Sequence, residues 1–299
     1  MSTALAGVAV LVWRGGRPPV VSVPDDAQPA GRSSQLATLI TAFTALGALV
    51  FTALSLQATR EQIHVAEQGQ ITDRYTRAID QLGTPGPEHL QVRLGGIFAL
   101  ERLAADSPRD RKTIIEVLTA FVRATSPRVP DTVCPPTPAD VQAAFVVLGR
   151  RDLTDYVFRP GDPPAVDLRA TCLAGILAPR SDLTGFTLGG ADLTGANLYD
   201  MRFDVIGLND TVLAGAILSE SDFTELTYVE GADFTGAQLL GAKFGSVVLT
   251  DVTFAYADLS GADLGDAHFV RADLTRVLHN QTVTTRATHD EATTGAWWG

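Results

Sequence analysis

A five-residue repeat in the C-terminal half of the chain constrains its fold more than any other feature. Segments such as SDLTG, ADLTG, SDFTE and ADLSG share a small residue, then Asp or Asn, then Leu or Phe. Repeat centres recur every five residues from Leu168, with one extra residue placed near Gly231. The 22 predicted centres are Leu168, Leu173, Ala178, Leu183, Leu188, Leu193, Leu198, Phe203, Leu208, Leu213, Leu218, Phe223, Tyr228, Phe234, Leu239, Phe244, Leu249, Phe254, Leu259, Leu264, Phe269 and Leu274. Such a fixed period is the signature of a solenoid, in which each unit packs on its neighbours.

The pattern resembles that of the pentapeptide-repeat family. The resemblance implies a right-handed quadrilateral β-helix over residues 166–276. Four repeats form one coil of that fold, so residues 20 apart stack at the strand spacing of about 4.8 Å, and 22 repeats form a rod about 26 Å long. The central residue and the small residue two positions before it are expected to fill a narrow core. The other three residues of each repeat are expected to face water.

One side of the predicted rod carries a column of stacked centres beneath a column of charges. The predicted core ladder is Leu183, Phe203, Phe223, Phe244 and Leu264. The residues before these centres form a charge ladder of alternating sign, Asp182, Arg202, Asp222, Lys243 and Asp263. Because opposite charges on neighbouring strands attract, this pattern favours a solvated, self-balancing face over a ligand groove. On the adjoining side, Asp192, Asp233 and Asp273 form a candidate acidic patch.

The net charge of −11 is concentrated in the repeats, since residues 166–276 contain 16 acidic and 6 basic residues. This excess of acidic residues argues against nucleic-acid binding, because Lys and Arg are needed to neutralise phosphates. Some pentapeptide-repeat proteins resemble B-form DNA in shape and charge and bind topoisomerase. The resemblance therefore offers a second interpretation, a DNA-mimicking inhibitor or protector of a DNA-binding enzyme such as gyrase.

Residues 36–57 are predicted to form a transmembrane helix. The stretch from residue 33 to residue 59 contains no charged side chain, and its central 21 residues would span about 31 Å as a helix. Residues 1–35 form a short apolar segment, residues 4–13, and a proline-rich loop. The apolar segment is either part of a first membrane helix or an interfacial segment, so the chain crosses the membrane once or in part twice. Arg32 and Arg60 flank the span equally and give no orientation.

Residues 58–150 are predicted to form a small α-helical domain. An amphipathic helix is expected up to Leu82, followed by a helix whose apolar face includes Leu94, Ile97 and Phe98. A third helix is expected to start with Ser107 as its N-cap, and a fourth near residue 139. The blocks RYTRAIDQLG, VRLGGIFALERLA and SPRD, within residues 69–127, resemble a family of actinobacterial membrane-anchored pentapeptide-repeat proteins. The second block is also similar to a HEAT-like helical hairpin.

Two segments flank the predicted β-helix. Residues 151–165 connect the helices to the first coil, and residues 277–299 are expected to cap the last coil, with Trp297 and Trp298 as apolar plugs. Cys172 is expected to face outward as a passive free thiol. No pattern of His, Cys or Asp in the chain matches a catalytic or metal motif, so neither an enzyme nor a cofactor is predicted.

These observations predict a mixed fold: an N-terminal transmembrane helix, a HEAT-like helical segment and a β-helix of pentapeptide repeats. The expected function is that of a non-catalytic membrane-anchored scaffold with an unknown protein partner. The resemblance implies a position in the cell membrane, with the C-terminal domains on the cytoplasmic side.

Overall fold

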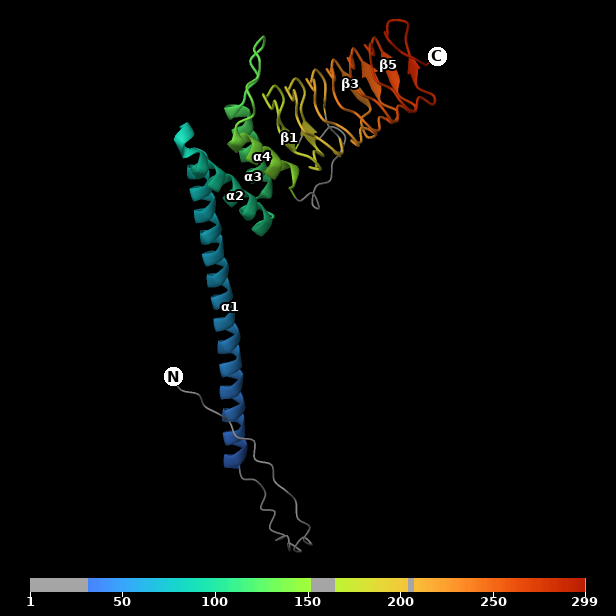
Figure 1. The fold of residues 1–299 in the computed structure, drawn as a ribbon. Helices are drawn as coiled ribbons and strands as arrows, with labels where there is room; N and C mark the ends of the chain where they lie inside the picture. The colour runs from blue at the N-terminus through green and yellow to red at the C-terminus, as the bar shows by residue number, and fades with distance from the viewer. Residues whose placement is uncertain (1–31, 152–164, 204–206, 299) are drawn as a thin grey trace, which may run out of the picture. The chain divides into compact units, whose positions relative to one another are not determined.

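The computed structural model describes residues 32–151, 165–203 and 207–298 (Figure 1). The apolar segment predicted at residues 4–13 and nearly all of the predicted connecting segment lie outside these ranges. The chain divides into two compact units, Met1–Val65 and Ala66–Gly299, and each is described by itself.

A single helix, α1, runs from Arg32 to Leu82. Between residues 43 and 56 its large apolar side chains are more than half exposed: Phe43, Leu46, Leu49, Val50, Phe51, Leu54 and Leu56. Within the described residues, α1 is the one helix whose length and composition would allow it to cross a membrane. The predicted span and the predicted amphipathic helix that follows it are therefore parts of one continuous helix.

The end of α1 packs with three further helices and a short 3-10 helix, η1 (Pro87–His89). The helices are α2 (Leu90–Asp106), α3 (Arg111–Thr125) and α4 (Ala139–Gly149). Gly96 of α2 lies against the backbone of α1, where a Cβ atom would be 2.7 Å from the carbonyl oxygen of Ala78. The doubled glycine in VRLGGIFALERLA therefore includes the point of closest approach between α1 and α2.

Two details of the helical domain differ from the sequence-based expectation. Phe98 was expected on the apolar face of α2 but is 47% exposed, and Leu100 is buried instead. Ser107 was expected as the N-cap of α3, yet α3 begins at Arg111. The Ser107 hydroxyl donates to the Asp110 carboxylate at 2.7 Å, so these residues form a turn that precedes the helix.

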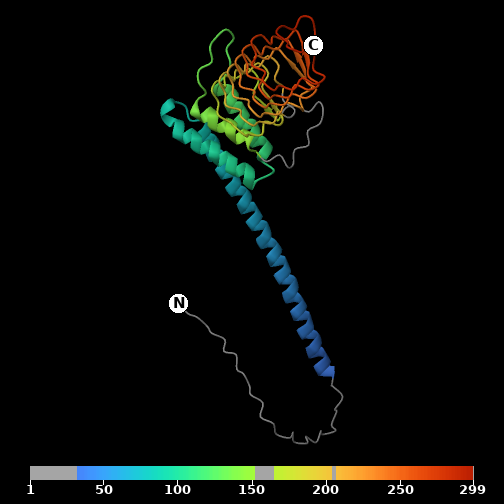
Figure 2. The same ribbon diagram turned by 45° about the vertical axis from the view of Figure 1, so that its right-hand side comes forward.

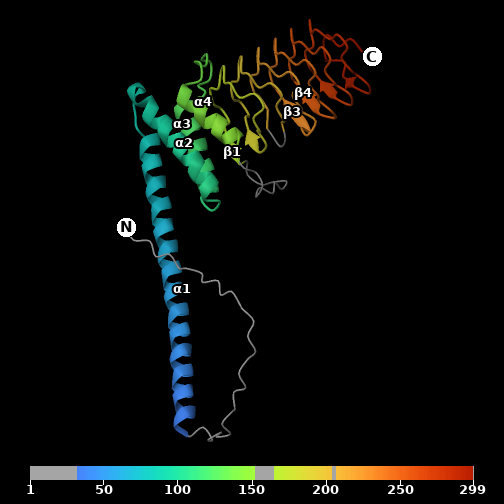
Figure 3. The ribbon, with the colours of Figure 1, turned by 60° about the horizontal axis from the view of Figure 1, so that its bottom comes forward.

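The repeats form a stack of coils that we call the rod, residues 166–294, with parallel pairing between successive coils (Figures 1 and 2). One sheet contains β1 (Val166–Asp167) and β2 (Phe186–Thr187). The other contains, in order, β3 (Tyr228–Glu230), β4 (Val248–Thr250), β5 (His268–Val270) and β6 (Thr288–His289) (Figure 3). Partners are 20 residues apart, as in Val166 with Phe186, which is the coil length predicted from the repeat.

The extra residue lies earlier in the chain than the repeat pattern suggested. Tyr228 was expected as a core centre, but it is 43% exposed, whereas Val229 is buried. Arg202 still pairs with Asp222 at a separation of 20, whereas Asp222 pairs with Lys243 at 21. Because Tyr228 already pairs with Val248 at 20, the insertion lies between Asp222 and Tyr228.

Large centres and small residues alternate inside the rod. Ala191, Ala216 and Ala237 are fully buried at the small position, two residues before a large centre. At Thr211 and Ser221 this position holds a hydroxyl that donates to a backbone carbonyl of the preceding coil, as Ser221 does to Leu198 at 3.0 Å. The core therefore admits a polar side chain only with a hydrogen-bond partner.

Both ends of the rod are covered. At the first coil, the amide of Asp182 donates to the carbonyl of Gly149, the last residue of α4. At the other end, parallel bridges continue beyond residue 276 to Thr294, so the segment predicted as a cap contains a further coil. The Trp298 ring lies 5.4 Å from that of Phe269, and Trp297 stacks on His279 at 4.2 Å. The tryptophan pair covers the aromatic end of the core.

Candidate interaction faces of the repeat rod

The charge ladder lies in one continuous column of paired positions, the Asp182 column. Bridges join each rung to the next, from Asp182 through Arg202, Asp222 and Lys243 to Asp263. Partial burial by itself raises the pKa of Asp222. Hydrogen bonds from Thr224 and the charges of Lys243 and Arg202 outweigh it and hold the pKa below its usual value. Arg202 and Lys243 thus stabilise the carboxylate that lies between them.

The core ladder lies directly beneath this column. Its five side chains are buried to 1% exposure or less: Leu183, Phe203, Phe223, Phe244 and Leu264. The ring centroids of Phe203 and Phe223 are 4.4 Å apart, and those of Phe223 and Phe244 are 4.8 Å apart, with nearly parallel planes. The three rings therefore stack at about the spacing of one coil and join the cores of three successive coils.

Asp192, Asp233 and Asp273 lie in one column, but an uncharged residue separates each pair. The order along this Asp192 column is Asp192, Val212, Asp233, Thr253 and Asp273. The patch is therefore a row of spaced carboxylates.

Each of these carboxylates also has a structural role. Asp192 accepts a hydrogen bond from the amide of Thr194 at 2.9 Å, and the other two make the same contact two residues ahead. Partial burial raises the pKa of Asp273, but hydrogen bonds from Thr275 and Thr294 outweigh it and lower the pKa. The Asp of the repeat therefore closes the turn that follows it, a role that the sequence reasoning missed.

At most centres the turn places a left-handed residue two positions after the centre. Gly195 and Gly236 have φ values of 65°, which explains the glycine that ends ADLTG and ADFTG. Non-glycine residues also adopt this conformation here, and several pair across coils. Arg180 contacts Asp200 at 3.1 Å, and Arg271 contacts Asp251 at 2.5 Å. Each of these corner ion pairs joins residues 20 apart, on successive coils. Opposite charges therefore lie next to each other at the corners, as they do in the Asp182 column.

The other two outward columns are nearly neutral. The Leu177 column contains Leu177, Asn197, Ile217, Gln238, Asp258 and Leu278. The Asp167 column consists of two paired runs, Asp167, Thr187 and Gly207, and then Tyr228, Val248, His268 and Thr288. Each of these two columns contains one acidic residue. In the first, the side chains of Leu177 and Leu278 are 59% and 56% exposed. The flat faces of the rod thus alternate between charged and nearly neutral.

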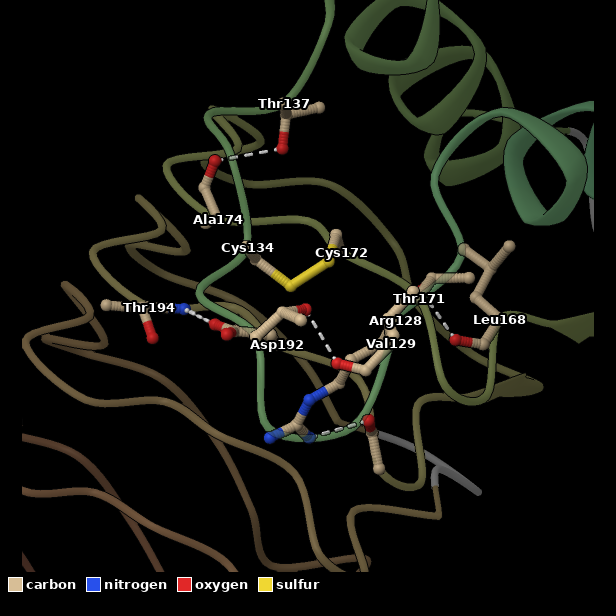
Figure 4. The surroundings of a disulfide bond; sticks show 12 residues. Arg128, Val129, Cys134, Thr137, Leu168, Thr171, Cys172, Ala174, Asp192 and Thr194 are labelled. Carbon is tan, nitrogen blue, oxygen red and sulfur yellow. Dashed lines mark hydrogen bonds between the residues drawn. A yellow bond between two sulfur atoms is a disulfide. The ribbon is translucent and has the colours of Figure 1, made fainter.

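A disulfide bond fastens the loop between α3 and α4 to the first coil (Figure 4). Cys172 was expected as a free thiol, but it is bonded to Cys134, with the two Cα atoms 5.4 Å apart. The same loop donates the amide of Arg128 to Ala170 and that of Thr137 to Ala174, both at 2.9 Å. It therefore covers the edge of the first coil, where Cys172 points outward into the loop.

Within the described ranges, no cluster of three or more His, Cys, Asp or Glu residues could hold a metal ion. Each carboxylate singled out above is bonded to a turn amide or lies in a charge ladder.

The family comparison agrees with this geometry. Residues 165–204 and 253–277 match the family model for pentapeptide repeats, in eight copies. The chain carries a domain of pentapeptide repeats. No curated protein matches the chain.

Solved structures similar to the pentapeptide-repeat domain include HetL, from the cyanobacterium Nostoc, a protein involved in heterocyst differentiation regulation. HetL is 26% identical over 41% of this chain and 61% of its own, with a TM-score of 0.27. QnrB1, a plasmid-mediated fluoroquinolone resistance protein, is 16% identical over 42% of this chain and 85% of its own, with a TM-score of 0.23. Rfr23, from the cyanobacterium Cyanothece, is 24% identical over 42% and 89%, with a TM-score of 0.14. The chain thus spans about three fifths of HetL.

Proposed function

We propose that this chain is a non-catalytic, membrane-anchored scaffold whose rod binds a protein partner. The observation that carries the anchoring is the apolar stretch of α1, where Phe43 and Phe51 are 71% and 75% exposed. Seven large apolar side chains exposed on one helix favour insertion into a bilayer over contact with water. A rigid stack with flat outer faces and covered ends suits a scaffold that presents a fixed surface.

The resemblance to actinobacterial membrane-anchored proteins supports a cytoplasmic position for the rod. The bond between Cys134 and Cys172 supports the opposite side, because disulfides persist in oxidising compartments and thiols stay reduced in the cytosol. We retain the cytoplasmic orientation as the proposal. It requires the two cysteines to be reduced in the growing cell and to form the bond on oxidation.

A reporter fusion tests anchoring and orientation together. A reporter active only in the cytoplasm is joined after Gly299, and the cells are separated into membrane and soluble fractions. The proposal expects an active, membrane-bound fusion. A soluble fusion contradicts the anchor, and an inactive membrane-bound fusion contradicts the orientation. Replacing Phe43, Val50 and Leu54 by Gln should release the fusion from the membrane, whereas the same change at exposed Val129 and Val133 should not.

DNA mimicry is a second candidate, favoured by the 16 acids against 6 bases in residues 166–276. Supercoiling by purified gyrase in the presence of excess protein tests it. Inhibition, or protection from a quinolone, would support mimicry. Unchanged gyrase activity in both assays would leave the scaffold as the remaining candidate.

A further inference from the structure

Three arginines of the helical domain line one pocket of about 380 Å³ between the end of α1 and α2. Arg74 and Arg77 extend from α1, one turn apart, and Arg102 extends from α2. Ala78 and Leu103, both buried, form part of its wall. Because Gly96 brings α2 against the backbone of α1 at Ala78, packed helices support the pocket.

These arginines differ from every other arginine that the structure describes from residue 66 onward. Each of the others has a hydrogen-bond, ion-pair or other electrostatic partner. Among the described arginines from residue 66 onward, only Arg74, Arg77 and Arg102 have no such partner, and all three line the same pocket.

The charge of the pocket defines the class of ligand. Asp106 is the single acid among the lining residues, so the lining carries a net charge of about +2. Guanidinium groups present planar pairs of N–H donors that match phosphate oxygens two at a time. The volume lies within the usual range for small-molecule sites.

We propose that this pocket binds a phosphate group of a small anionic ligand, either a soluble phosphate compound or the headgroup of an anionic lipid. The chemistry is the same for both sources, since each supplies phosphate oxygens to the three guanidinium groups. The proposal does not depend on the function of the rod or on its side of the membrane. Because all three arginines are exposed, binding should weaken as salt increases.

The test compares the full chain with the variant Arg77→Gln/Arg102→Gln. Lys112→Gln is the matched control, since Lys112 is exposed on α3 and lies outside the pocket. Pyrophosphate is titrated calorimetrically into each protein in an uncharged detergent at low salt. A parallel arm measures thermal unfolding in nanodiscs of phosphatidylcholine, alone or mixed with phosphatidic acid. Thermal unfolding in detergent without ligand checks that all three proteins fold.

Saturable pyrophosphate binding that weakens at least tenfold in the double variant, but not in the control, supports a soluble ligand. Stabilisation by phosphatidic acid that the double variant loses and the control keeps supports a lipid headgroup. Equal responses of all three proteins in both arms, or no response, would overturn the proposal. An equal loss in the control would also overturn it, because net charge alone would then explain binding.

Discussion

Reducing the bond between Cys134 and Cys172 should destabilise the helical domain and the first coil by an amount that the fold allows us to calculate. The two residues are 38 positions apart. A cross-link over a loop of that length lowers the entropy of the unfolded chain by about 13 cal/mol/K. At room temperature this corresponds to about 4 kcal/mol of unfolding free energy.

The closed loop contains elements that fold against each other, which makes the calculated figure an upper value. It includes α4 and the amide of Thr137, which bonds to the first coil, as does the amide of Arg128 just before the loop. These hydrogen bonds hold the loop after reduction and keep the native structure in place. We therefore expect the reduced protein to fold with an unchanged circular dichroism spectrum and a lower resistance to urea.

Urea unfolding of the full chain in an uncharged detergent, with and without dithiothreitol, measures the difference. The double variant Cys134→Ser/Cys172→Ser should match the reduced protein and should not respond to dithiothreitol. Resistance of the native thiols to alkylation before reduction checks that the bond is present. An alkylation-resistant protein whose urea midpoint is the same before and after reduction would refute the loop-entropy argument.

Three further perturbations test the core, the helical domain and the turns. Phe223→Ala removes the middle of the stacked phenylalanines and should lower the unfolding free energy by about 3–5 kcal/mol in urea. Asp140→Ala leaves Arg93, which contacts the Asp140 carboxylate at 2.6 Å, without its charged partner. The thermal unfolding midpoint of this variant should fall, and its unfolding free energy should be lower by about 3 kcal/mol. Asp222 and Asp273 have lowered pKa values in the fold, so their stabilisation is complete above the ordinary value near 3.8. Urea midpoints at decreasing pH should fall as the pH drops through the lowered values.

Each of these three predictions has a control variant. Glu225→Ala, at an exposed position near Phe223, and Glu116→Ala, at an exposed position of α3, should each change stability by less than about 0.5 kcal/mol. Equal losses in these controls would contradict the assignment of Phe223 and Asp140 to the core. Asp222→Asn/Asp273→Asn should show a shallower dependence of stability on pH below about pH 4. An unchanged slope would mean that other carboxylates dominate acid unfolding.

The period of the repeat predicted the coil length, because a spacing of 20 residues leaves little freedom once four repeats form a coil. The position of the single insertion was not predictable in the same way. Leu226, Tyr228 and Val229 are all apolar, so more than one register places a large residue in the core. Pairing of Tyr228 with Val248 on the next coil decides between them, and that contact involves residues 20 apart.

The disulfide and the arginine pocket depend on tertiary contacts and lay beyond sequence reasoning. Cys134 lies in a loop whose path is set by the packing of α3 and α4 on the first coil. Arg77 and Arg102 line one pocket where α1 and α2 pack together, and Gly96 lies directly against the backbone of α1 at Ala78. The turn-closing role of Asp was within reach of the sequence, since Asp two residues before a turn amide is a known turn former.

The distribution of charge on the rod bears on which partner it fits. A net charge of −10 for residues 166–276, over about 26 Å, gives one negative charge per about 2.6 Å, against one per about 1.7 Å in duplex DNA. The rod also lacks the uniform negative charge of a duplex, since the Asp182 column contains Arg202 and Lys243 and the Leu177 and Asp167 columns are nearly neutral. A protein that binds one flat face of the rod does not require the charge density of DNA. The columns therefore favour a partner that docks on a face over one that encloses the rod as it would a duplex.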